Sequence, residues 1–454
     1  MTAFKIKKVE KRSGYILSLI AGITVLLYFD IVNHYWFLKL LGGFLIKIWV
    51  PPLLLFLYVL IRRMIRKENI FKIRIINLSL VVYAIAGIIA MLLNEPLYSA
   101  IKYYLIMIAP VWFYVVISET VRDNKDIELL IKVLFFCGLV LSLQTFYYNS
   151  QLKGSSLLEE EITSSAGNTI GFGGDTTFKI KDEGTYTVLS RGVLNVEHSN
   201  YCGMLTPLIL FGIMYYISSK GKDKFIYLGG SFLMLFQIID TMSRAGIATV
   251  LVGIIILSWC LYRYEKTKRV KIVVMLTIVV TAGVVYLVAF SNLILIIRFI
   301  TLFNMFDLPL FLQDYLEIIQ HSQVIDPHIA TMSESFNTFL SSPFFGSGFD
   351  FKEGAQELNR YLFILASAGV FTFISYVLFF LVLTVSVRKA MLSFRLLKSY
   401  ELNYGYLFFA AGIAFLFKFN NQGQELFYYW IVFALASAWI RNCKREQTAI
   451  RRIV

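Results

Sequence analysis

Charged side chains are scarce in this chain of 454 residues. They make up 16% of it, and 58% of the residues are hydrophobic, whereas soluble globular proteins average about 25% charged residues. This scarcity excludes an ordinary soluble protein. Cysteine is scarce too: three of the four cysteines fall within long apolar runs, and Cys443 lies in the C-terminal tail. No disulfide framework is therefore expected.

Several functional motifs are also missing. The first apolar run has no small-residue cleavage site, so we expect it to anchor the chain. The stretch Gly167–Asp175 resembles a phosphate loop, but no Gly-Lys-Ser/Thr follows it, which argues against a nucleotide site. No Asp-x-Asp motif is present to hold a divalent cation over a pyrophosphate. We expect neither a metal nor another cofactor.

The chain has instead a series of long apolar runs, near the roughly 20 residues that a helix needs to cross a bilayer. They predict an all-α fold: a polytopic transmembrane helix bundle that forms a single integral membrane domain over 1–454. We place about twelve spans at 14–29, 36–61, 75–93, 101–118, 127–147, 198–217, 225–240, 245–262, 270–290, 360–386, 403–418 and 425–440. Pro51-Pro52 predicts a kink or break in the second span.

The positive charges behind the net charge of +14 are concentrated in certain segments of the chain, in a pattern that predicts its membrane topology. Of the 43 lysines and arginines, 30 lie in the segments 1–13, 62–74, 119–126, 218–224, 263–271, 387–402 and 441–454. The longer segments 148–197 and 291–359 hold only six. This asymmetry predicts both termini in the cytoplasm and the two long segments outside. The basic excess therefore does not indicate a nucleic-acid partner.

The outer segment 291–359 begins with two apolar or mixed stretches. Asn292–Phe306 and Asp307–His321 are predicted to lie along the outer membrane surface as amphipathic helices. Charged residues also gather at the outer ends of spans, where ions are costly unless they face a wet cavity or each other. For Arg191, Lys418 and Glu425, an ordinary interfacial charge solvated by snorkelling is an equal alternative.

Four short motifs carry a resemblance to a known family. They are Glu197–Asn200 (EHSN), Thr241–Gly246 (TMSRAG), Pro343–Phe349 (PFFGSGF), and Glu357–Leu362 (ELNRYL) with Ala366–Val370 (ASAGV). They resemble, in order, the His-Pro-Asn, Ser-Arg-Gly/Ala, Pro-x-x-Gly-x-Gly and His-Asn-x-Tyr-Leu…Ala-Glu-x-Gly elements of the O-antigen ligase and polymerase family, over roughly 190–385. Leu358 stands where the ligases have their proposed catalytic histidine. This departure favours a polymerase and leaves a general base unassigned.

The resemblance implies a glycosyltransferase in the bacterial cytoplasmic membrane, and the missing Asp-x-Asp motif favours a metal-independent reaction. Its donor would be a glycan on undecaprenyl pyrophosphate at the outer face. A hydroxyl of the acceptor attacks the anomeric carbon, and the lipid pyrophosphate leaves. In a polymerase of surface polysaccharide the acceptor is another lipid-linked repeat unit, and a flippase and a chain-length regulator are possible protein partners. The alternatives are a ligase with the same donor, a polysaccharide-lipid flippase or transporter, and a structural membrane protein.

The chemistry of this reaction indicates which residues could take part in it. Arginines neutralise the leaving pyrophosphate, and a carboxylate or imidazole assists the hydroxyl. We expect pyrophosphate binding by Arg244, Arg360 and Arg298, catalysis by Glu357, Glu197 and His198, and substrate binding by Asn200, Asn359, Ser243, Gly346 and Gly348. His198 has a structural alternative, and Arg298 could instead snorkel to water. We predict that Arg298, Glu357, Asn359 and Arg360 converge with Arg244 around one outward-facing cavity.

Overall fold

A computed structural model provides the fold. It describes residues 16–25, 50–65, 75–93, 97–153, 177–182, 185–190, 198–219, 221–241, 243–264, 326–348, 359–396, 404–419 and 427–451, with isolated residues between 270 and 283. Within these ranges, four helices are long and apolar enough to cross a bilayer: Asn124–Tyr147, Tyr201–Ser218, Ala245–Tyr264 and Arg360–Ser393. Five further apolar helices are shorter. The chain is a helical membrane protein, and the number of spans remains a prediction.

The helices follow the predicted apolar runs closely. Their bounds are α3 Val50–Ile65, α4 Ile75–Leu92, α5 Leu97–Thr120, α6 Asn124–Lys153, α8 His198–Ser218, α9 Lys224–Asp240, α10 Arg244–Tyr264, α14 Asp326–Ser341, α15 Arg360–Leu396, α16 Tyr404–Phe419 and α17 Phe427–Arg451. A further helical stretch covers Ile16–Val25. Several helices extend beyond the predicted span ends. Apolar composition predicts which residues lie in the membrane, but a helix can continue past them.

One expectation needs adjustment, and two stay untested. Pro51 and Pro52 lie in the first turn of α3, where proline is tolerated; the residues just before α3 lie outside the described part of the chain, so the kink or break there stays a prediction. The described chain is not purely helical: Thr177–Asp182 (β1) and Thr185–Ser190 (β2) form an antiparallel hairpin. The stretches 36–49 and 292–321, the latter with the predicted surface helices, lie outside the described residues.

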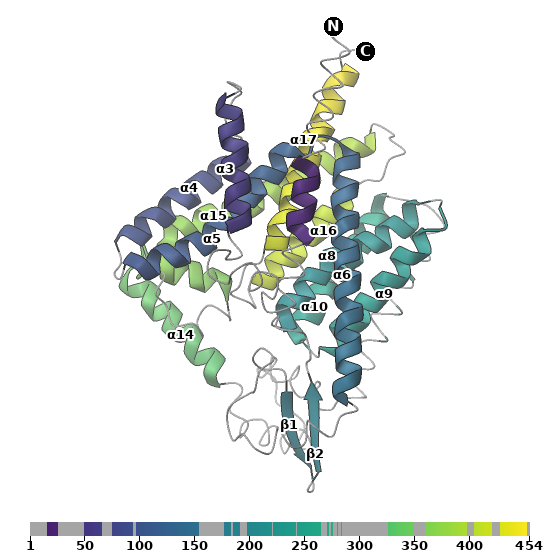
Figure 1. The fold of residues 1–454 in the computed structure, drawn as a ribbon, viewed down its shortest axis with the longest axis horizontal. Helices are drawn as coiled ribbons and strands as arrows, with labels where there is room; N and C mark the ends of the chain where they lie inside the picture. Colours follow the sequence, from purple (N-terminus) through teal and green to yellow (C-terminus); the bar gives the residue numbers. More distant parts are fainter. Residues whose placement is uncertain are drawn as a thin grey trace.

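The bundle has two distinct ends (Figure 1). The hairpin and α14 lie at one end, and the C-terminal part of α17 projects from the other. The hairpin and α14 belong to the two segments predicted to be outside, 148–197 and 291–359. Described residues of the predicted cytoplasmic segments 62–74, 119–126 and 441–454 (Arg63, Glu119, Val121 and Arg441) meet at the opposite end. The grouping agrees with the predicted topology, while the sidedness itself stays a prediction.

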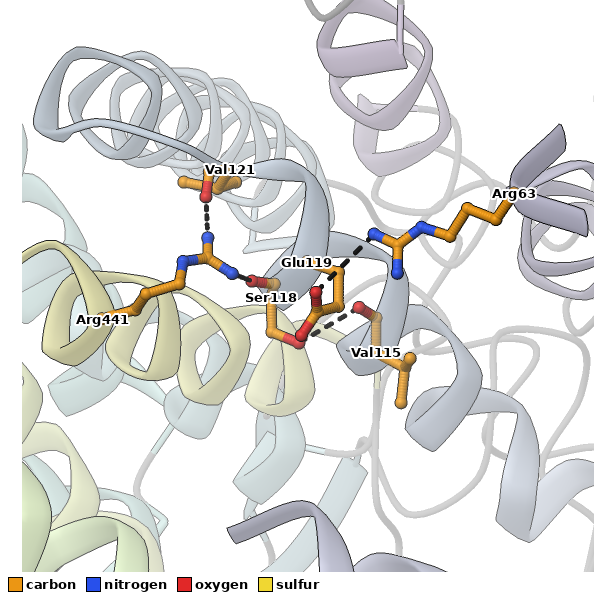
Figure 2. Close-up of polar contacts among 6 residues, drawn as sticks. All are labelled: Arg63, Val115, Ser118, Glu119, Val121 and Arg441. Carbon is orange, nitrogen blue, oxygen red and sulfur yellow. Dashed lines mark hydrogen bonds and ion pairs between the residues drawn. The ribbon is translucent and has the colours of Figure 1, made fainter. Parts of the chain in front are cut away.

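Arg441 of α17 joins this helix to the end of α5 at the second end of the bundle (Figure 2). Its guanidinium donates hydrogen bonds to the backbone carbonyls of Ser118 and Val121, where α5 ends. The last carbonyls of a helix have no intrahelical donor, so the arginine caps α5. Beside it, Arg63 of α3 approaches Glu119 of α5 at 3.6 Å. We call this arrangement the arginine clasp.

Aromatic side chains fill the core between α15, α16 and α17. Phe379 and Phe380 of α15 lie 5.4 and 6.2 Å from Trp430 of α17, measured between ring centroids. Phe415 of α16 lies 4.6 Å from Tyr429 in an edge-to-face contact, a geometry that aromatic rings favour. This packing holds the last turn of α16 against the first turn of α17, at the end opposite the arginine clasp.

Candidate active site

The turn between α9 and α10 is closed by its own side chains. Thr241 ends α9, with its hydroxyl donating to the Ile238 carbonyl at 2.6 Å. Ser243 is the N-cap of α10: its Oγ accepts from the Gly246 N–H at 3.2 Å, and its carbonyl accepts from the Ile247 N–H. Serine is a preferred residue at this position. The Ser-Arg-Ala-Gly motif therefore builds a cap that places Arg244 at the first position of α10.

Arg244 occupies an electrostatically unusual position. The described part of this residue is its backbone, which begins α10. The N-terminus of a helix carries a partial positive charge and exposes N–H donors, so it attracts anions and disfavours cations. An arginine there becomes favourable when an anion lies nearby. The backbone position is thus consistent with the predicted role in binding a phosphate, and the role itself remains a prediction.

The first turn of α8 packs against this turn. The Cys202 thiol lies 3.3 Å from the Thr241 hydroxyl, within hydrogen-bonding distance. Gly246 of α10 allows the approach, because a Cβ there would lie 2.4 Å from the Cys202 sulfur. His198 and Asn200 belong to this same first turn of α8. The structure therefore brings the backbone of the His198 motif and the Arg244 motif together.

Arg360 begins α15 and is buried, with 6% of its surface exposed. The preceding Asn359 is the N-cap: its Oδ1 accepts from the backbone N–H groups of Tyr361 and Leu362 at 3.0 and 3.1 Å. The Arg360 guanidinium lies over the Phe363 ring, 5.2 Å from its centroid, a cation–π contact. A second motif arginine is thus fixed at the start of a helix by an N-cap.

The third motif docks onto a break in α15. Gly369 has φ +76° and interrupts the helix, leaving backbone groups that the loop 343–348 satisfies. Ser347 and Gly348 donate their N–H groups to the carbonyls of Ala366 and Ser367 at 2.9 and 3.1 Å. In return, the Val370 N–H donates to the Pro343 carbonyl at 2.9 Å. Residues that are 19 or more positions apart in sequence therefore join two motifs into one unit.

The glycines of this unit allow two backbones to touch. A Cβ on Gly346, which has φ +72°, would lie 2.3 Å from the Ser367 carbonyl carbon, and one on Gly369 would lie 2.2 Å from the Phe344 oxygen. The N–H groups of Gly346 and Gly348 both bond within the protein. These glycines were predicted to bind substrate. Because their N–H groups are already bonded, a contact of this loop with substrate would have to use other atoms of the loop.

The remaining predicted residues are tested only in part. Glu197, Arg298 and Glu357 lie outside the described residues, as do the side chains of His198, Asn200 and Arg244. Ser243 and Asn359, predicted to bind substrate, are helix caps in the structure. The structure thus gives the helix starts that carry Arg244 and Arg360, and the single shared cavity stays a prediction.

Sequence reasoning undervalued Lys418. Because it lies near a predicted span end, a snorkelling surface charge and a functional residue were equal interpretations. In the structure only 1% of its surface is exposed. It lies in the last turn of α16. A Cβ on Gly203 of α8 would lie 2.4 Å from the Lys418 Cε and 2.0 Å from the Tyr429 hydroxyl. No local sequence signal separates a buried lysine at a span end from an exposed one.

These features define a helical membrane protein whose buried basic and polar residues gather at helix ends. Residues 229–377 match a family model described as O-antigen ligase. The match runs from α9 into α15 and includes the Arg244 motif, the docked loop and the start of α15. It confirms the resemblance to the O-antigen polymerase and ligase family, whose members are membrane enzymes acting on lipid-linked glycans. No curated protein matches the chain.

Proposed function

We propose that the protein polymerises undecaprenyl-pyrophosphate-linked repeat units into a surface polysaccharide, at the outer face of the bacterial cytoplasmic membrane. The family match over 229–377 supports the reaction class. The observation that carries the proposal furthest is the placement of Arg244 and Arg360 at capped helix starts, where an anion offsets their charge. Leu358 in place of the ligase histidine favours a polymerase.

The proposed reaction needs little covalent participation by the protein. The acceptor hydroxyl attacks the anomeric carbon of the donor glycan, the bond from that carbon to the pyrophosphate oxygen breaks, and the hydroxyl proton is released. Negative charge grows on the departing lipid pyrophosphate. Arginines held in place before the reaction stabilise this charge without reorganising, and their planar forks suit phosphate oxygens. Glu357, Glu197 and His198 remain the proposed candidates for taking the proton.

A ligase is the second candidate, because the matching family model is described by that activity. A ligase uses the same lipid donor and transfers the finished glycan to a different acceptor. A polymerase instead joins lipid-linked repeat units to one another. The two functions therefore predict different products in a cell that lacks the protein.

The glycan profile of a deletion strain separates the candidates. A polymerase mutant retains single repeat units and loses long chains. A ligase mutant retains lipid-linked polymer and loses all attached chains. An unchanged glycan profile would contradict both. Complementation with the wild-type chain restores the long chains under the proposed function, and this serves as the control for effects on neighbouring genes.

A further inference from the structure

Lys418 is a buried cation in a part of the bundle that contains several uncharged polar groups. Its side chain passes over Gly203 of α8, where the missing Cβ leaves room for the Lys418 Cδ and Cε atoms. Cys202 precedes Gly203 in α8, and its thiol lies 3.3 Å from the Thr241 hydroxyl. A lysine near a membrane surface ordinarily extends its ammonium to water. Lys418 instead lies against the inside of the bundle.

The position of α16 links the two motif arginines. This helix packs against both α10, which Arg244 begins, and α15, which Arg360 begins. On the α15 side, the Tyr361 hydroxyl donates to the Leu416 carbonyl at 2.9 Å, and the Tyr361 ring meets that of Phe419 at 6.5 Å. Lys418 therefore lies between residues that touch the start of α15.

On the other side, Lys418 is joined to the Arg244 turn by a short series of contacts. Cys202 bonds Thr241, and the Thr241 Oγ1 accepts from the Ser243 N–H at 3.3 Å. Thr241 and Ser243 are 3% and 2% exposed, so this connection is shielded from solvent. Arg244, Arg360 and Lys418 thus lie at the ends of three helices, and contacts of α8 and α16 connect these ends.

A buried charge near a membrane is costly and usually has a functional reason. Even a whole buried ion pair can often be exchanged for apolar groups without loss of stability, so stability alone is weak grounds for retaining a lysine here. We infer that Lys418 is a further phosphate-binding residue, which supplies positive charge to the lipid-linked pyrophosphate between the sites of Arg244 and Arg360. This inference rests on the proposed lipid-pyrophosphate donor.

The test compares three variants of the full-length protein, purified in lipid nanodiscs. Undecaprenyl pyrophosphate is the probe, and undecaprenol, with the same tail and no phosphate, is its control. Lys418→Met removes the charge and keeps the length of the side chain. Lys418→Arg keeps the charge, and Tyr429→Phe removes a neighbouring hydroxyl as a control for altered packing. Thermal unfolding gives Tm with and without each lipid, and titration gives Kd.

The expected result is a separation of binding from stability. Lys418→Met remains folded without lipid, binds undecaprenyl pyrophosphate at least about tenfold more weakly, and binds undecaprenol as wild type does. Lys418→Arg regains part of the affinity, and Tyr429→Phe stays within about twofold of wild type. Competition by inorganic pyrophosphate in wild type, reduced in Lys418→Met, would show that the headgroup alone is recognised.

Two outcomes would overturn the inference. A Lys418→Met protein with lowered Tm and wild-type affinity for undecaprenyl pyrophosphate makes the lysine structural. Failure of both Lys418→Met and Lys418→Arg to accumulate in membranes leads to the same conclusion. If wild type itself does not prefer undecaprenyl pyrophosphate to undecaprenol, the proposed function fails first. If wild type shows the preference and Lys418→Met keeps it, only the role of Lys418 fails.

Discussion

The two ends of the bundle hold arginines in opposite electrostatic settings. At the arginine clasp, Arg441 faces the C-terminal end of α5 and donates to two of its carbonyls. At the other end, Arg360 and Arg244 stand at the N-terminal ends of α15 and α10. A helix C-terminus supplies acceptors and a partial negative charge, whereas an N-terminus supplies donors and a partial positive charge. The first setting is suited to holding the fold, and the second to receiving an anion.

Cysteine labelling would establish which end faces outward, with an all-or-none result. The four natural cysteines are buried, so an added cysteine should report alone. Asn337 in α14 and Lys222 between α8 and α9 are exposed. An impermeant maleimide on intact cells is expected to label Asn337→Cys, and to label Lys222→Cys only after the membrane is opened. The reverse pattern would place the arginine clasp outside.

Arg244→Ala is expected to remove the polymer while leaving the protein level unchanged. Loss of a charge that stabilises the leaving pyrophosphate lowers the rate by roughly 10²-fold or more. Arg244→Lys should recover only part of the activity, because lysine lacks the planar fork. A glycan ladder and an immunoblot on the same cells measure both quantities. Chains of wild-type length in Arg244→Ala would exclude this residue from the site.

Arg441→Ala should show the opposite pattern, a loss of stability. It leaves two buried carbonyls at the end of α5 without their donors, at about 1–3 kcal/mol each. Thermal unfolding in detergent measures the loss, and polymer made per folded molecule should stay near wild type. An unchanged Tm would contradict the structural role of the clasp.

Gly369→Ala should destabilise the end that carries Arg360. The new Cβ would lie 2.2 Å from the Phe344 oxygen, at a backbone φ of +76°, a conformation that costs a non-glycine residue about 1–3 kcal/mol. Gly229→Ala in α9 is the matched control, because nothing lies within 4 Å of its added Cβ. Equal Tm values for the two variants would argue against the docked loop.

Glu119→Gln should have the smallest effect. The Arg63–Glu119 pair is separated by 3.6 Å and is partly exposed, and such pairs contribute about 1 kcal/mol or less. The fall in Tm should therefore be clearly smaller than for Arg441→Ala. A fall of equal size would mean that the ion pair, and not the capping of α5, holds this end together.

The sequence predicted the elements better than their contacts. The start of α8 at His198 and the end of α9 at Asp240 match the predicted spans, because apolar runs bounded by polar residues define them. The break at Gly369 could not be predicted, because it depends on hydrogen bonds from a loop more than 20 residues earlier in the chain. Both motifs were recognised, but sequence does not indicate that Ser347 bonds Ala366.

The residues of the candidate site were likewise predicted only in part. Arg244 and Arg360 were identified because motifs surround them, and the structure gives each a fixed backbone position at a helix start. Lys418 has no motif, and its burial depends on the absent side chain of Gly203 more than two hundred residues away in the sequence. The hairpin of β1 and β2 was missed because its segment was read only as a polar outer loop.

The docked loop also helps to fix the position of Arg360 around the axis of α15. The stretch of α15 before Gly369 is fastened at Ala366 and Ser367 by bonds from the docked loop and at Tyr361 by a bond to α16. Arg360 lies six residues before Ala366, and each residue advances a helix by about 100°. One extra residue between them would rotate Arg360 by that angle relative to the docked loop, although every glycine contact survived. The number of residues between Arg360 and Ala366 thus fixes the rotation of Arg360 about the helix axis. We expect this segment to tolerate substitutions better than insertions or deletions.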